Sequence, residues 1–177
     1  GGHLFVEGEA GDRFAVRNSG TTAVVEGVGD FGCEYMTNGA VLNLGGFGKG
    51  FGNGMSGGFA YQYDPEGKLS LSYSEDSVFL RDVTEDTEEA SMHRACIRQM
   101  LEAHIRYTGS AKAKSILDNF EAEMANFRYL KPRSLALYQD ADAILANAAR
   151  KALTDELAKA LAAYQVRKFK LAYRDGY

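Results

Sequence analysis

Residues 23–32 read AVVEGVGDFG, and the last six of these letters match the G-x-G-x-x-G pattern of dinucleotide-binding loops. That pattern requires a helix directly after the glycines and an acidic residue about 20 positions further on. Here residues 33–38 are too short for a helix before Gly39, and the later acidic position falls in VLNLGG. The context of the motif therefore argues against a nucleotide site.

The glycines around this stretch recur with a period of 19 residues. One phase comprises Gly8, Gly27 and Gly46, and a second comprises Gly1, Gly20, Gly39 and Gly58. Apolar positions follow the same period, in the sets Val6, Val25, Leu44, Tyr63 and Leu4, Ala23, Leu42, Tyr61. A single nucleotide loop has no reason to repeat with its apolar positions in register, whereas a solenoid has one.

In a β-solenoid each turn contributes short strands whose inward side chains stack on those of the neighbouring turns. The chain bends sharply at the same place in every turn, and glycine tolerates the positive φ and close backbone approach of such corners. The repeat therefore predicts a mainly β fold, a right-handed single-stranded β-helix over residues 1–80. The structural corner glycines are expected to be Gly8, Gly20, Gly27, Gly39, Gly46 and Gly58.

The second half of the chain has a different composition. Seventeen of the 20 glycines lie in residues 1–58, and residues 85–177 hold only two of them. This half is rich in Ala, Lys, Leu and Glu and shows helical periodicity, so we expect an α-helical C-terminal tail over residues 85–177 that packs on or beyond the solenoid.

The boundaries of the first two helices follow from capping signals. Asp86 and Glu89 form a plausible capping box, Gly109 ends the first helix, and Ser110 caps the second. The second helix is expected to end before Pro132. The expected apolar face of the first helix is Met92, Ala95, Cys96, Met100 and Ile105; that of the second is Ile116, Leu117, Phe120, Met124 and Phe127. Two further Ala-rich helical regions are expected near residues 141 and 154.

Several segments also resemble a known family. GDRFAVRNSG (11–20), AVVEGVGDFGCEYMTNG (23–39) and GMSGGFAY (54–61) look like the G-x-x-G-x-x-x-G repeat domain at the C-terminus of the glutamate synthase large subunit. HIRYTGSAKAKSILDNF (104–120) and FRYLKP (127–132) resemble the helical tail of that subunit. The likeness covers about residues 1–133. Phe31 departs from it, because the family usually has His after GVGD.

The resemblance implies a non-catalytic domain that holds a glutaminase domain and a synthase domain in fixed relation. The synthase domain of such an enzyme carries FMN and an iron–sulfur cluster, so no cofactor is expected in this chain. The expected partners are other domains or subunits of glutamate synthase. Two alternatives are a free-standing β-solenoid adaptor and a subunit like that of formylmethanofuran dehydrogenase, in which related repeats occur.

Four other groups of residues have a possible chemical role, and for each a purely structural role is the alternative. His93, Cys96 and His104, with Cys33 as a fourth ligand, are conceivable metal ligands, but apolar neighbours indicate a core face. Asp30 and Glu34 resemble an acid/base pair without a nucleophile or oxyanion hole. Lys49 lies in a glycine-rich stretch that lacks the P-loop order. The cations and aromatics of the tail favour a solvated helix end over nucleic acid: Tyr164, Arg167, Lys168, Phe169, Lys170, Tyr173 and Arg174.

Composition and charge set the remaining bounds. Residues 1–90 carry 5 basic and 15 acidic side chains, whereas residues 91–177 carry 15 and 9, so the two halves can attract each other. No apolar run is long enough to cross a bilayer, and two widely spaced cysteines indicate buried thiols of a cytoplasmic protein. The sequence opens without Met inside what reads as structure, which suggests a fragment or a processed chain. Its exposed first coil would need a cover: upstream coils, a partner or self-association.

Overall fold

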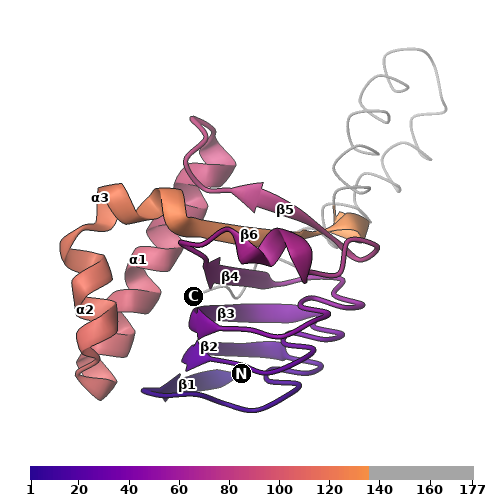
Figure 1. Cartoon of the computed structure of the whole chain (residues 1–177), viewed down its shortest axis with the longest axis horizontal. Helices are drawn as coiled ribbons and strands as arrows, with labels where there is room; N and C mark the ends of the chain where they lie inside the picture. Colours follow the sequence, from indigo (N-terminus) through magenta and orange to yellow (C-terminus); the bar gives the residue numbers. More distant parts are fainter. Residues whose placement is uncertain (136–177) are drawn as a thin grey trace, which may run out of the picture.

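The computed structural model describes residues 1–135 of the chain, and its core is a stack of parallel strands (Figure 1). The stacked strands are β1 (Gly2–Val6), β2 (Ser19–Gly27), β3 (Asn38–Gly46) and β4 (Phe59–Tyr63). Each pairs in parallel with the next, and an irregular loop leads from one strand to the following one. The predicted β-solenoid is confirmed, and no α-helix lies between these four strands.

The stacking offset between coils is not constant. Strands β1 and β2 pair at an offset of 19 residues, as in Leu4 with Ala23, and so do β3 and β4. In the middle of the β2–β3 pair the offset falls to 18 residues, so that Val24 pairs with Leu42. Irregularities at the two ends restore an offset of 19, in the pairs Ser19 with Asn38 and Gly27 with Gly46. The expected alignment of Ala23 with Leu42 is therefore wrong by one residue, because β-bulges absorb one residue there.

The loop side of each coil is built from consecutive turns in which alternate residues have positive φ. In the first coil, for example, the Val16 amide donates to the Arg13 carbonyl oxygen at 3.1 Å, and Ala15 between them has φ 58°. Equivalent residues repeat this conformation: Arg13, Ala15 and Arg17; then Phe31, Cys33 and Tyr35; then Gly50, Gly52 and Gly54. Only the third coil has glycine at these places, so the first two coils adopt an unfavourable conformation with ordinary residues.

The first helix begins and ends close to the expected residues. Helix α1 (Glu88–Thr108) is capped by Thr87, whose side chain accepts from the Ala90 amide, so the capping box predicted at Asp86 is displaced by one residue. Gly109 ends α1 with φ 77°, and the Ser110 side chain caps α2 (Ala111–Asp118), both as predicted. The buried face of α1 differs from the expected one: Ala90, His93, Cys96, Ile97, Met100, Leu101 and His104. Met92 and Ala95 are exposed instead.

The segment after α2 contradicts the prediction of one long helix. The helical conformation is interrupted at Asn119 and resumes only for α3 (Phe120–Glu123) and the 3₁₀ turn η2 (Met124–Asn126). The chain then becomes strand β6 (Phe127–Pro132), which pairs antiparallel with β4. The final sheet order is β1-β2-β3-β4-β6-β5, where β5 is Val78–Asp82. Another 3₁₀ turn, η1, spans Lys68–Leu71.

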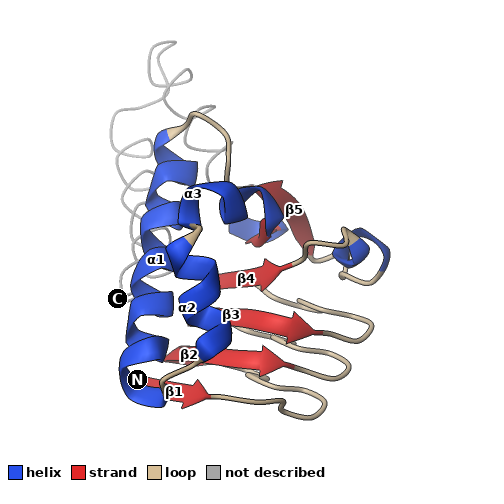
Figure 2. Cartoon of the chain, turned by 60° about the vertical axis from the view of Figure 1, so that its left-hand side comes forward, coloured by secondary structure: helices blue, strands red, loops and turns tan. Residues whose placement is uncertain are grey.

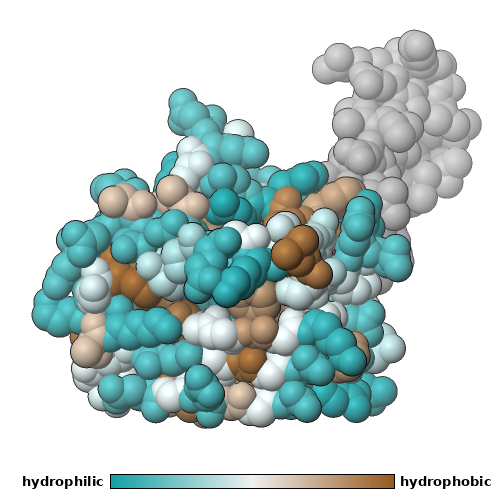
Figure 3. All heavy atoms as spheres, viewed as in Figure 1, coloured by the Kyte–Doolittle hydropathy of each residue, from teal (hydrophilic) through white to brown (hydrophobic). Residues whose placement is uncertain are grey.

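The inner strands of the sheet are buried on both faces, which separates two apolar clusters, whereas the outer surface seen in Figure 3 is mostly hydrophilic. One cluster lies between the sheet and the helices, where Figure 2 shows α1 and α2 against the strands, and it includes Leu42 and Tyr61. The other fills the interior of the coils, where the strands contribute small side chains such as Ala23 and Ala60. Alternating residues of each strand supply the two clusters, as the two-residue period of a strand requires.

Three predictions concern features that the described residues do not test or test only in part. The helical regions expected near residues 141 and 154 lie outside the described part of the chain. The division into residues 1–80 and 85–177 stays a prediction, although β6 returns the chain to the sheet of the solenoid. Within residues 1–135 no helix has the length and apolar character needed to cross a membrane.

Candidate functional site

The predicted corner glycines lie at the ends of the stacked strands, but they differ in backbone conformation. Among the glycines at the start of the strands, φ is 91° at Gly39 and 80° at Gly58, whereas Gly20 has no positive φ. A Cβ added at Gly39 would lie 2.5 Å from the Thr21 carbonyl oxygen, while one at Gly20 would have nothing closer than 3.9 Å. The shared role of this phase therefore stays a prediction, with a steric reason at Gly39 that Gly20 lacks.

The glycines at the other end of the strands, Gly8, Gly27 and Gly46, also differ in φ and in the space around them. Gly8 has φ 134° with open space around it, and a Cβ at Gly27 would lie 2.8 Å from Cγ of Glu9. Gly46 has neither a positive φ nor any heavy atom within 4 Å of an added Cβ. Its neighbour Gly45, which the 19-residue phase does not single out, is the most crowded glycine among those described.

A buried polar junction joins the helices to the solenoid. Glu26, at the end of β2, accepts hydrogen bonds through one carboxylate oxygen from the Ser110 hydroxyl and from Nε2 of His104 at 3.0 Å. Burial alone would raise the pKa of Glu26, but the hydrogen bonds from Ser110 and His104 hold it below its usual value. Ser110 also caps α2, so one carboxylate fixes the turn between both helices against the sheet.

A second buried histidine, His93, joins the N-terminal part of α1 to the sheet. Nδ1 of His93 lies 2.8 Å from the Tyr61 hydroxyl, and its ring packs 4.0 Å from that of Tyr129. Burial, together with the nearby Lys131 ammonium, lowers the pKa of His93 to about 3. His93 is therefore neutral at physiological pH and acts as an apolar, hydrogen-bonded core residue.

The structure separates the candidate metal ligands. His93, Cys96 and His104 share the buried face of α1, but the two histidines contact different strands through Tyr61 and Glu26. Cys33 belongs to the cluster inside the coils, on the other side of the sheet from Cys96. The described residues contain no group of three or more His, Cys, Asp and Glu side chains placed to hold a metal ion.

The acidic candidates are engaged in stacking one coil on the next. Asp30 accepts from the Lys49 amide at 3.0 Å, and its own amide donates to the Asp12 carboxylate at 2.8 Å. Glu34 pairs with Arg13 at 2.9 Å and accepts from the side-chain amide of Asn53, through its Nδ2, at 3.1 Å. Both acids bond to adjacent coils, which gives each a structural role.

The basic candidates divide between described and undescribed residues. The Lys49 ammonium lies 5.8 Å from the centre of the Phe31 ring, a cation–π contact between adjacent coils. The cations and aromatics of residues 164–174 lie outside the described part of the chain.

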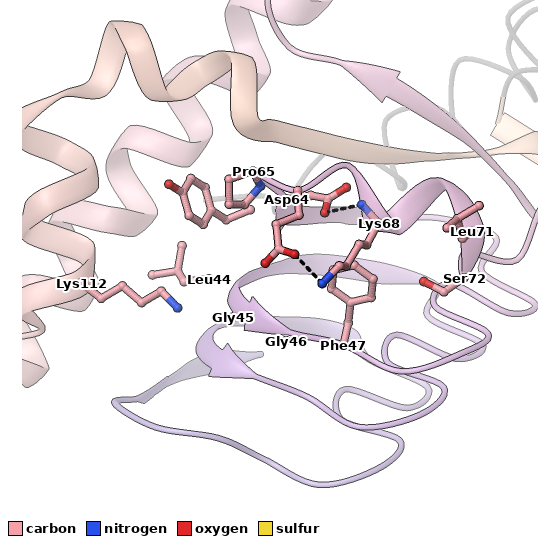
Figure 4. A pocket seen from close by; sticks show the side chains of 12 residues that line it. Leu44, Gly45, Gly46, Phe47, Asp64, Pro65, Lys68, Leu71, Ser72 and Lys112 are labelled. Atoms are coloured by element: carbon pink, nitrogen blue, oxygen red, sulfur yellow. Dashed lines mark hydrogen bonds and ion pairs between the residues drawn. The ribbon is translucent and has the colours of Figure 1, made fainter.

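A partly open pocket of about 620 Å³ lies where the solenoid, η1 and α2 meet (Figure 4). The ends of β3 and β4, the turn η1 and the start of α2 each supply part of its wall. Sequence reasoning missed this pocket, because its walls come from segments up to 68 residues apart, Leu44 and Lys112. The only sequence signal was that Gly46 continues the 19-residue phase.

Comparison with known proteins identifies a family and several relatives of this chain. Residues 1–133 match the family described as GXGXG motif. The chain is 46% identical over 132 residues to glutamate synthase (NADH) of Schizosaccharomyces pombe, which covers 75% of this chain and 6% of that protein. It is 44% identical over 133 residues to the glutamate synthase (NADPH) large chain of Bacillus subtilis, covering 75% of this chain and 8% of that protein. It is also 44% identical over 135 residues to the ferredoxin-dependent glutamate synthase of Antithamnion sp., covering 76% and 8% respectively. The chain thus spans less than a tenth of the length of these relatives.

Proposed function

The chain belongs to the GXGXG motif family, and we propose that it is a non-catalytic structural domain of a glutamate synthase-like enzyme. Such an enzyme hydrolyses glutamine and adds the released ammonia to 2-oxoglutarate, with electrons from a reductant that is oxidised, to form glutamate. In this proposal the domain holds the glutaminase and synthase domains in fixed relation. The observation that carries it is the continuous stacking of coils, with acids such as Asp30 bonded to the coils on both sides.

The stacked architecture suits a spacer. Each coil contacts its neighbours through a ladder of backbone hydrogen bonds, and side-chain bonds such as Asn43 to Gln62, at 2.7 Å, connect adjacent coils inside the stack. A solenoid of this kind is stiff along its axis because every coil is supported by the next. The helices are fixed to the same stack through Glu26 and His93.

The cysteines of this chain do not suit an iron–sulfur cluster. An iron–sulfur cluster is held by Cys thiolates, usually four, and the sequence contains two cysteines, both buried and in separate clusters. Burial raises the pKa of the Cys33 thiol to about 12, which disfavours the thiolate that a metal needs. We propose that FMN and the iron–sulfur cluster both belong to the synthase domain of the enzyme, and that the enzyme is cytoplasmic.

The test compares the isolated chain with the complete large chain. Titration of the 177-residue chain with FMN and with NAD should show no binding by calorimetry, and the chain should have neither glutaminase nor glutamate synthase activity. Removing the domain from a complete large chain should impair the coupling of glutamine hydrolysis to glutamate formation. Micromolar cofactor binding by the isolated chain would refute the scaffold role, and unimpaired coupling without the domain would favour a free-standing adaptor.

A further inference from the structure

The pocket beside α2 has features that the scaffold role does not use. Its wall is mainly apolar, and Figure 4 shows Lys112 and Lys68 at two sides of it. Its volume of about 620 Å³ falls within the range of pockets that bury a ligand or an anchoring side chain. The apolar part of the wall is formed by Leu44, Phe47, Tyr63, Pro65 and Leu71.

No packing contact within the described chain requires glycine at position 46, which lies in the pocket wall. The equivalent glycine in the preceding coil, Gly27, has Glu9 against it, and the one before that, Gly8, has φ 134°. Gly46 has an ordinary φ, and an added Cβ would meet no atom of the described chain within 4 Å. A glycine in open space at a pocket wall allows close approach of a group from another molecule or segment.

Leu71 is presented at the rim of the pocket by a firmly anchored turn. It is 88% exposed, the highest value among the large apolar side chains described. The turn η1 is held in place by two contacts. The Asp64 carboxylate accepts from the backbone amides of Lys68 and Leu69, both at 2.9 Å, and the Leu69 side chain is fully buried. The exposure of Leu71 is therefore imposed by the fold, as at the edge of a contact surface.

Lys112 is the charge at the pocket wall that can attract an acidic occupant, because the other charged side chains there, Asp64, Glu66 and Lys68, bond to one another or to the turn η1. Within the part of the chain that the structure describes, no carboxylate lies at ion-pair distance from Lys112, although that of Glu26 is close enough to interact with it electrostatically, whereas Lys68 pairs with Glu66. Lys112 also lies in the first turn of α2, where the helix dipole adds to its positive potential. A carboxylate that reaches this wall would gain an ion pair.

We propose that this pocket docks a loop of the longer glutamate synthase polypeptide, outside these 177 residues, that presents a large apolar side chain beside a carboxylate. The inference rests on the proposed function. A covalently connected occupant is favoured because this chain spans 6–8% of the length of its relatives, so most of the polypeptide it accompanies lies elsewhere. The apolar side chain fills the space at Gly46 against Leu71, and the carboxylate pairs with Lys112.

The test uses overlapping 12-residue peptides that cover the Bacillus subtilis large chain, probed with the labelled 177-residue chain. We expect binding to a small set of peptides that combine an apolar and an acidic residue. Gly46→Leu should weaken that binding at least tenfold, and Lys112→Gln should weaken it only for peptides whose carboxylate is intact. Gly11→Leu is the matched control, since Gly11 also has an ordinary φ and open space, but in the first coil.

Thermal melts followed by circular dichroism establish that each variant is folded. Binding to no peptide, or binding that Gly46→Leu leaves unchanged, would overturn the docking inference. Binding only to peptides from the region homologous to this chain would overturn it in favour of a second copy. The scaffold role is judged separately by the coupling assay, so a failed docking site and a failed scaffold give different results.

Discussion

Gly45 lies directly against the backbone of Glu26 in the preceding coil: a Cβ added at Gly45 would be 1.8 Å from the Glu26 carbonyl oxygen. That separation is far inside any tolerable contact, and the obstructing atom belongs to a hydrogen-bonded strand. Close stacking of β2 on β3 therefore depends on the missing side chain at this position.

We expect Gly45→Ala to destabilise the chain by about 1–3 kcal/mol, because the clash separates two paired strands. Its neighbour provides the control, since Gly46→Ala meets no atom within 4 Å and has an ordinary φ. Gly46→Ala should change stability by less than about 1 kcal/mol. Urea denaturation of both variants measures the difference, and equal midpoints would contradict the assigned packing.

Gly39 tests the corner role that the repeat predicts. Gly39→Ala combines a φ of 91° with a Cβ 2.5 Å from the Thr21 carbonyl oxygen, so a loss of about 1–3 kcal/mol is expected. Gly20→Ala, at the same phase without either feature, should cost a few tenths of a kcal/mol or stabilise slightly. In a complete enzyme, Gly39→Ala should lower folding yield and coupling but leave each half-reaction competent. A loss of cofactor binding at unchanged stability would instead support the nucleotide-loop interpretation.

Relief of backbone strain should stabilise the first coil. Arg17 is exposed and has φ 54°, a conformation that costs an ordinary residue about 1–2 kcal/mol. Arg17→Gly should therefore raise stability by about 0.5–1 kcal/mol after the entropic cost of glycine. Val16→Gly is the matched control at an exposed neighbour without positive φ, and it should lower stability by a similar amount. Thermal denaturation distinguishes the two; a loss in both variants would show that the strain is absent.

The Glu26 junction should make the chain sensitive to acid. Because the folded-state pKa of Glu26 lies below the ordinary value of 4.5, its contribution is present above pH 4.5 and is lost as the pH falls through the folded-state value. Glu26→Gln should cost about 1–3 kcal/mol at pH 7, because charge-assisted bonds from Ser110 and His104 are weakened. Urea midpoints of both proteins, measured from pH 7 to pH 3, should converge at the acid end; a constant difference would contradict this role.

The free edge of β1 should mediate association unless another coil covers it. Strand β1 is at one end of the sheet order, and Leu4 on it is 45% exposed. Unpaired amides and carbonyls on an edge strand favour pairing with a further strand. Analytical ultracentrifugation should show concentration-dependent association of the isolated chain, and Leu4→Lys should reduce it. A wild-type chain that stays monomeric at millimolar concentration would show that this end needs no cover.

Sequence alone determined the solenoid, because coil stacking places equivalent residues one period apart and therefore leaves a repeat in the chain. The helix boundary at Gly109 and Ser110 was equally local, since a positive φ and a capping hydroxyl act within one turn. The resemblance added the family, which the comparisons with known proteins then showed.

Tertiary structure decided the features that depend on neighbours. Residues 127–132 have an apolar pattern that also suits a helix, but they become β6 because the edge of β4 offers unpaired backbone groups. The 18-residue offset between β2 and β3, and with it the clash that makes Gly45 indispensable, arises from bulges that no period reveals. Arg17 and Tyr35 adopt positive φ because the stacked coils require the same turn in each layer, whichever residue the sequence supplies.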